Sequence, residues 1–272
     1  MHIDFIPFEK FSNITYLAKG GFGKIFKTKC YNGINNWSTR RQRFDLQGNS
    51  DVVLKSLNDS KNIDLDFLTN GLVIIHENQS VHKDLHSGNI LVFGDCKMCK
   101  IGDFGISRPA NTIVNGENIY GVIPYVAPEI FNGERYTAAS DIYSFGMVIW
   151  ELTSGLRPHS NRDHDGFLIL NILNGLRPEI VDNTPLFFVE LMEKCWDADP
   201  LKRPTADHIY QTLNEKLKSN EGFLEVKKSI LNVKASPQAI FSSRPLDSLI
   251  STALILQKIH SVNYVIITSK RY

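Results

Sequence analysis

The stretch VHKDLHSGNIL, residues 81–91, followed by IGDFG at residues 101–105, carries most of the information about the fold. In the first motif Asp84 precedes Asn89 by five residues, in a loop that leads into an apolar strand. In the second, Asp103 stands before a Phe-Gly pair, whose glycine lets the chain turn sharply. An aspartate can accept a proton from a hydroxyl group, and carboxylate and amide oxygens are ligands of Mg²⁺. A turn with the composition of the first motif is common by chance. Such a turn followed closely by the second motif is not.

A glycine-rich turn lies N-terminal to these motifs. Residues 14–30 predict two strands joined by a turn that contains Gly20, Gly21 and Gly23. Glycines allow a backbone to approach a phosphate closely. A tight hairpin without a ligand explains the same residues, so both interpretations stay open. The polar residues 31–50 that follow predict an exposed loop.

A lysine ends the next apolar run. VVLK, residues 52–55, predicts a short strand that carries Lys55. A buried ammonium group needs an anionic partner such as a phosphate. An edge strand with a solvated lysine is the alternative. Residues 58–70 are polar and weakly patterned, and an apolar piece follows at 71–76.

The C-terminal two thirds predict a hairpin and then helices. Residues 88–103 indicate two strands. Ser140 is a suitable N-cap for an apolar, buried helix that runs to Thr153 and stops at Gly155. Thr205 begins a further helix with leucine and isoleucine on one face. Beyond about residue 220 the pattern weakens.

Seven motifs in this order resemble the protein kinases. They are the glycine turn, VVLK, HKDLHSGN, DFG, YVAPE, SDIYSFGMVIWEL and CWDADPLKRPT. The last two most resemble the tyrosine-kinase-like group, including the expanded kinase-like families of some fungi. The resemblance implies an α+β, protein-kinase-like fold with a reduced, β-rich N-lobe and a mainly helical C-lobe. The corresponding segments are an N-lobe remnant (1–57), a truncated linker (58–70), a C-lobe (71–219) and a weakly structured tail (220–272).

The resemblance also implies a role for each matching residue, with ATP and Mg²⁺ as cofactors and a protein as the acceptor. Gly20, Gly21 and Gly23 would lie over the ATP phosphates, Ile25 against the adenine, and Lys55 on the α- and β-phosphates. Asp84 would deprotonate the acceptor hydroxyl, while Asn89 and Asp103 would hold magnesium. Glu129 and Arg203 would form a buried ion pair, and Asp141 would fasten the catalytic loop.

The chain departs from the family in three ways that bear on function. Lys83 stands where the family has an arginine that grips an activation-loop phosphate, and His86 stands where many Ser/Thr kinases have a lysine. Asp84 lies only 29 positions after Lys55, where a complete kinase has a segment several times longer. Most of helix αC through most of αE would be missing, which leaves about seven residues of αE, roughly 10 Å of helix. A skipped exon, an incomplete gene model or a lineage-specific deletion would each produce such a break.

Composition excludes several other classes of function. Thirty basic and twenty-nine acidic residues give a net charge of +1, which offers no basis for binding nucleic acid or an anionic membrane. Polar residues interrupt the apolar stretch 249–267, so we expect a soluble, cytoplasmic protein without a membrane span. Cys96 and Cys99 form a C-x-x-C pair, which could be redox-active or half of a zinc site. Because no second Cys or His pair lies at zinc-ligand spacing, two ordinary cysteines are favoured.

Three functions are compatible with these residues. The first is an ATP-dependent protein kinase that leans towards Ser/Thr acceptors, because Tyr125 stands where tyrosine kinases tend to have a tryptophan. The second is an interaction module without catalysis, and the third is a product that folds poorly. For residues 249–259 we expect a loosely ordered tail rather than an amphipathic helix that covers the C-lobe. The sequence does not predict the oligomeric state.

Overall fold

The structure is a computed structural model that describes most of the 272 residues. The described ranges are 11–20, 23–30, 35–38, 43–46, 50–57, 65–93, 98–104, 106–109, 118–182, 184–218 and 234–269. Gly21 and Cys96 therefore lie outside the described residues.

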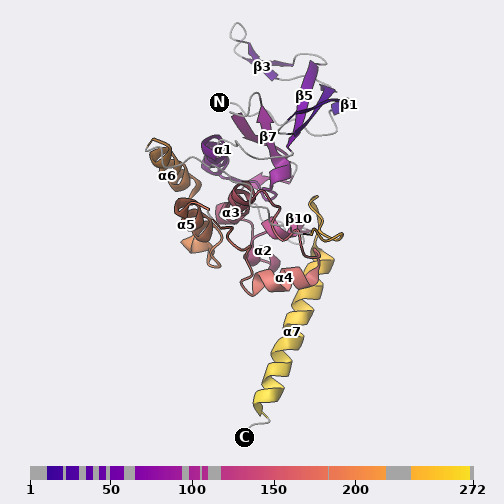
Figure 1. Ribbon diagram of the computed structural model, residues 1–272, viewed down its shortest axis with the longest axis vertical. Helices are drawn as coiled ribbons and strands as arrows, with labels where there is room; N and C mark the ends of the chain where they lie inside the picture. The colour runs from indigo at the N-terminus through magenta and orange to yellow at the C-terminus, as the bar shows by residue number, and fades with distance from the viewer. Residues whose placement is uncertain are drawn as a thin grey trace.

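Strands form the N-terminal part, as Figure 1 shows in indigo and violet. They comprise a three-stranded antiparallel sheet in the order β1 (Phe11–Gly20), β2 (Gly23–Cys30) and β5 (Ser50–Leu57), and a hairpin of β3 (Asn35–Ser38) and β4 (Arg43–Leu46). The two strands expected within 14–30 and the lysine strand are confirmed. The loop expected at 31–50 is wrong in part because it contains the β3–β4 hairpin, in which the strand-favouring Trp37 and Phe44 are register partners.

Helices dominate the remainder of the chain, and the α+β class is thereby confirmed. The helices are α1 (Leu65–Glu77), α2 (Pro128–Phe131), α3 (Ala138–Ser154), α4 (Gly166–Leu173), α5 (Leu186–Cys195), α6 (Ala206–Lys218) and α7 (Asp247–Ser269), with short 3₁₀ turns at Ser87–Asn89, Ile123–Tyr125 and Pro200–Lys202. The strands are β6 (Ser80–Val81) paired with β9 (Arg108–Pro109), β7 (Ile90–Phe93) with β8 (Met98–Ile101), and β10 (Tyr120–Gly121) with β11 (Arg244–Pro245). The pairing of β7 with β8 confirms the expected hairpin.

Helix α1 is about twice as long as the seven residues expected before the catalytic loop. Its thirteen residues span roughly 20 Å at 1.5 Å per residue. Leu65, Leu68 and Leu72 are buried at helical spacing. The polar Thr69 obscured this period in the sequence, but its hydroxyl donates to the Leu65 carbonyl at 2.6 Å and needs no solvent. The helix packs against α6 and β8, so it covers this side of the core.

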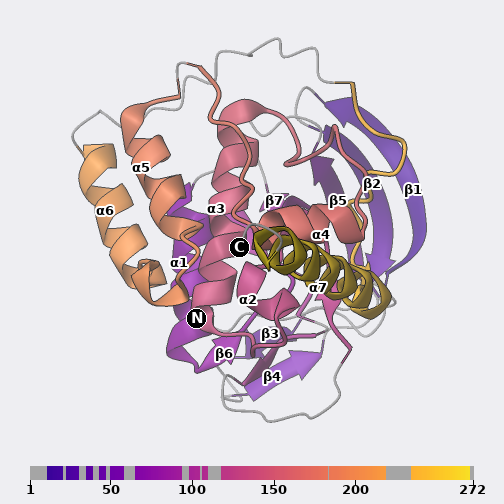
Figure 2. The ribbon, with the colours of Figure 1, turned by 90° about the horizontal axis from the view of Figure 1, so that it is seen from below.

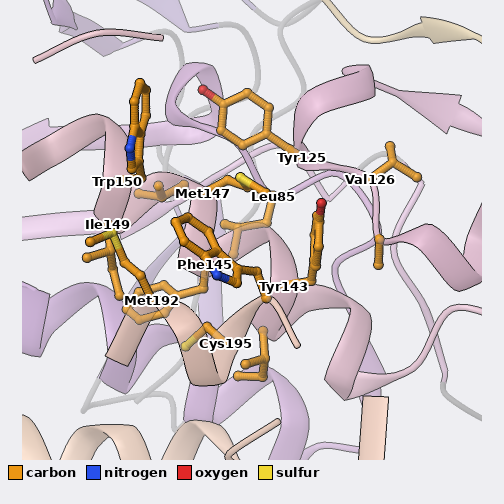
Figure 3. Packing of buried hydrophobic residues seen from close by; sticks show 14 of the residues in the cluster. Leu85, Tyr125, Val126, Tyr143, Phe145, Met147, Ile149, Trp150, Met192 and Cys195 are labelled. Atoms are coloured by element: carbon orange, nitrogen blue, oxygen red, sulfur yellow. The ribbon is translucent and has the colours of Figure 1, made fainter. Parts of the chain in front are cut away.

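Helix α3 forms the centre of the core. The N-cap is Thr137, so the expectation that Ser140 caps the helix is wrong: Ser140 is three residues further on and completes a capping box with Thr137. Gly155 ends the helix in the left-handed conformation with φ of 71°. Figure 3 shows side chains of α3 between Tyr125 and Val126 on one side and Met192 and Cys195 of α5 on the other. Fourteen of its seventeen residues are buried, which confirms the expected buried helix. Such a helix is a rigid support for loops attached to it.

The C-terminal segment differs from the loosely ordered tail that the sequence predicted. Residues 234–246 make backbone hydrogen bonds to Ser160, His164 and Ile119. Helix α7 packs against α4, and Figure 2 shows α7 crossing in front of α4. Leu246 and Ala253 are fully buried and Ile250 is nearly so. The apolar positions 246, 250 and 253 share a helix face, whereas Ser, Thr and Gln elsewhere dilute the signal. Among the described residues, no helix combines the length and the apolar character that a bilayer crossing requires.

Candidate active site

Asp141, in the first turn of α3, fixes the shape of the loop at residues 82–84. Its carboxylate is 1% exposed and accepts the backbone N–H groups of His82 at 2.8 Å and Lys83 at 3.0 Å. His76 Nε2 of α1 lies 3.0 Å from the same carboxylate. Lys83 has φ of 72°, a left-handed conformation that residues other than glycine rarely adopt. The two charge-assisted hydrogen bonds to Asp141 hold the backbone at this residue and the one before it. The expected fastening role of Asp141 agrees with these contacts.

Asp84, Asn89 and Asp103 come together around this loop. The Asn89 side-chain Nδ2 donates to the Asp84 carbonyl at 2.8 Å, which commits the amide nitrogen and leaves the amide oxygen as the atom able to bind a cation. The Gly102 N–H donates to the Asn89 carbonyl at 2.7 Å. Asp103 is the next residue in the chain, so this backbone bond holds it close to Asn89. Asp84 and Asn89 are buried, whereas Asp103 is exposed and has φ of 59°. An amide and a carboxylate oxygen together form a donor set that suits Mg²⁺.

His82 joins the two motifs through its ring. Its Nδ1 accepts the Asp84 N–H at 3.3 Å, so the proton is on Nε2, which donates to the Gly102 carbonyl at 3.0 Å. The ring also lies 5.1 Å from the Phe104 ring, centroid to centroid. The positions of the aspartates in HKD and DFG are therefore coupled through one buried imidazole.

His86 lies beside the Asp84 carboxylate. Its Nδ1 accepts the Gly88 N–H at 3.1 Å, which places the proton of the neutral ring on Nε2. That nitrogen is 3.7 Å from Asp84 Oδ2. The ring is buried, so its N–H faces the carboxylate without a hydrogen bond of normal length.

The structure describes the backbone of the two strands that flank the glycine turn and of the lysine strand. Gly20 pairs with Gly23 at the end of the β1–β2 hairpin, and Ile25 of β2 pairs with Lys55 of β5. Strand β5 contacts β7, which begins directly after Asn89. The side chains of Ile25 and Lys55, like the whole of Gly21, lie outside the described residues. Their roles stay predictions.

Glu129 and Arg203 form the buried pair that the resemblance implied. Arg203 donates from Nη1 to Glu129 Oε1 at 2.6 Å and from Nη2 to Oε2 at 2.8 Å. A third bond from Nη1 reaches the Ala139 carbonyl at 2.9 Å. The pair thus ties the segment after YVAP to the start of α3 and to the loop before α6.

A second polar pair, of buried Tyr125 with partly buried Glu151, was not predicted from the sequence. The Tyr125 hydroxyl donates to the Glu151 carboxylate on α3. Burial raises the pKa of Glu151, and burial together with the nearby Glu151 raises the pKa of Tyr125 well above 10. The signal available in the sequence was the single acid in the apolar run 145–152, which a buried helix tolerates only with a partner.

Comparisons with known proteins agree with this geometry. A family model described as "Protein tyrosine and serine/threonine kinase" matches residues 65–213, more than half of the chain. The chain is 39% identical over 143 residues to "Probable serine/threonine-protein kinase roco5" of Dictyostelium discoideum, covering 48% of this chain and 5% of that protein. It is 31% identical over 150 residues to "Serine/threonine-protein kinase STY17" of Arabidopsis thaliana, covering 54% and 26%. The chain thus spans a minor part of these relatives, and it belongs to the protein tyrosine and serine/threonine kinase family.

Proposed function

We propose that the chain transfers the γ-phosphate of ATP to a hydroxyl group of a protein, with Mg²⁺ as cofactor. The observation that carries the proposal is the hydrogen-bonded connection from Asp84 through Asn89 to Gly102 and Asp103. This connection supports assigning Asp84 as the proton acceptor and Asn89 and Asp103 as oxygen ligands, and the Asp141 carboxylate bonds to the backbone of the same loop. In this proposal Asn89 and Asp103 hold the cation, and Asp84 takes the hydroxyl proton. When bound, Mg-ATP supplies the phosphoryl group and the metal offsets the charge of the phosphates.

The nucleotide side of the proposal assigns residues 1–57 to a reduced N-lobe. Gly20, Gly21 and Gly23 would cover the phosphates, Ile25 would contact the adenine, and Lys55 would pair with the α- and β-phosphates. This assignment is supported by the register of β2 against β5 and by the contact of β5 with β7. The linker expected at 58–70 is shortened in this proposal to 58–64, because α1 begins at Leu65 and is assigned to the C-lobe. This short linker would replace the longer connection of a complete kinase.

The proposed acceptor is serine or threonine. The relatives that match are named as serine/threonine kinases. Tyr125 is buried and bonded to Glu151 in the segment before the APE motif, the position where tyrosine kinases tend to have a tryptophan. Phosphoamino-acid analysis of the labelled product would test this choice, since phosphotyrosine as the main product would contradict it.

The transfer itself is tested with labelled ATP, Mg²⁺ and casein as a generic acceptor. Asp84→Asn is the control because it retains the shape of the side chain and removes the base. We expect incorporation with the native chain and a loss of at least about a hundredfold in the variant. Equal incorporation from both chains would refute the assignment of Asp84.

Nucleotide binding is measured separately by thermal unfolding with Mg-ATP. A ligand that binds only the folded state stabilises it by about 2.7 kcal/mol at a hundred times its dissociation constant. We expect this stabilisation to require Mg²⁺ and to be lost in Lys55→Ala. A native chain that is indifferent to Mg-ATP would instead be an interaction module without catalysis.

A further inference from the structure

The C-terminal segment lies as an extended strand on the backbone next to the candidate base. Arg244 and Pro245 of β11 pair with Gly121 and Tyr120 of β10 in antiparallel register. The Leu246 N–H continues this pairing by donating to the Ile119 carbonyl at 2.8 Å. Binding of a strand to an exposed edge is a common way for proteins to hold an extended polypeptide.

Contacts on both sides of β11 hold the segment in place. Arg244 Nη2 donates to the His164 carbonyl at 2.6 Å, and the Ile119 N–H donates to Asp247 Oδ1 at 3.2 Å. The Ser236 N–H donates to the Ser160 carbonyl at 2.8 Å further upstream. The fully buried Leu246 is the apolar anchor between these polar contacts.

Gly121 brings the segment and Asp84 together. A Cβ atom placed on Gly121 would lie 3.8 Å from Asp84 Oδ1 and 4.0 Å from Leu246 Cδ1. The candidate base and the buried leucine therefore flank the same residue of β10. The segment Arg244–Asp247 thus lies on the β10 edge beside Asp84.

The residues on the edge cannot themselves accept a phosphate. Arg244, Pro245, Leu246 and Asp247 have no hydroxyl group. We propose that this four-residue segment is a built-in competitor of the acceptor polypeptide: it occupies the β10 edge in cis and must leave before a protein acceptor can reach Asp84. The inference rests on the proposed function and adds a regulated acceptor site to it.

Two variants of the full chain release the segment without changing the residues assigned to catalysis. Leu246→Asp places a charge in a fully buried position, and Arg244→Ala removes the bond to His164. Ile255→Ser is the matched control, because Ile255 lies on the exposed side of α7. Hydrogen exchange over residues 234–259 should rise in both release variants and stay native-like in the control.

The first readout is phosphate transfer to casein. We expect both release variants to exceed the native chain, by about tenfold for Leu246→Asp, because a charge at a buried leucine position weakens docking by at least that factor. Transfer that is unchanged while hydrogen exchange reports release would overturn the inference and leave the proposed function intact. Labelled phosphate on Ser242 or Ser243 of the native chain would also overturn it, because the segment would then be a substrate.

The second readout does not depend on catalysis. A fluorescent peptide of residues 236–252 should bind the Leu246→Asp chain at least tenfold more tightly than the native chain, whose edge is occupied. Casein should displace the peptide and Mg-ATP should not. Displacement without transfer in any chain would support the competitor and refute the proposed function. Failure of casein to displace the peptide, or of the peptide to bind, would overturn the competitor.

Discussion

Replacement of Asp141 by asparagine should destabilise the folded chain through the catalytic loop. The carboxylate accepts two backbone N–H groups, those of His82 and Lys83, and hydrogen bonds to a charged acceptor contribute about 1.5–3 kcal/mol each. An asparagine keeps one oxygen and turns an NH₂ group towards the second N–H. We therefore expect a loss of about 3 kcal/mol, the sum of one lost bond and one unsatisfied buried donor.

Urea unfolding at neutral pH measures this loss, with Asp207→Asn as the matched control. Asp207 also lies in the first turn of a helix, but it is exposed. Its replacement reports the helix-dipole contribution of about 0.3–1 kcal/mol together with the exposed hydrogen bond that it accepts from Gln211. Lys83→Gly should recover part of the loss in the Asp141→Asn background, because glycine adopts positive φ freely. A native-like unfolding free energy for Asp141→Asn would refute the view that these two bonds hold the loop.

Three further predictions concern other described residues. Arg203→Met should cost about 3–5 kcal/mol in urea unfolding, because it leaves Glu129 buried without a cation, and adding Glu129→Gln should restore part of it. Burial lowers the pKa of His159 to about 4, so as the pH falls the unfolded chain binds a proton on this residue before the folded chain does. The free energy of unfolding should therefore decrease by up to about 3 kcal/mol from pH 6.5 to pH 4. His159→Asn should flatten the curve of stability against pH. Gly121→Ala should lower transfer and stability, since its Cβ would lie 2.7 Å from Val126 Cγ2; native-like values for both would contradict the required close approach.

The sequence predicted the parts of this molecule that short-range rules determine. The capped helix ending at Gly155 and the β7–β8 hairpin follow from residues close to one another in the chain. The Glu129–Arg203 pair was available only through the family resemblance, because the two residues are 74 positions apart. Recognising motif order thus supplied long-range contacts that periodicity could not.

Two elements were underestimated from the sequence for the same physical reason. Helix α1 and the C-terminal segment were underestimated because their apolar residues are interrupted by polar ones whose hydrogen bonds are satisfied locally. Thr69 bonds to the carbonyl four residues before it, and Thr252 and Ser251 do the same in α7. The docking of β11 on β10 depends on residues more than 120 positions apart, and two-residue strands leave no periodic signal.

The attachment of the loop at residues 82–84 to α3 has a consequence for the candidate site. In the described part of the chain, hydrogen bonds from α1, α3, the DFG segment and the loop itself shape residues 82–89. A substitution in α1 or α3 that removes one of these bonds should therefore disturb the candidate site without changing any residue proposed to bind the nucleotide.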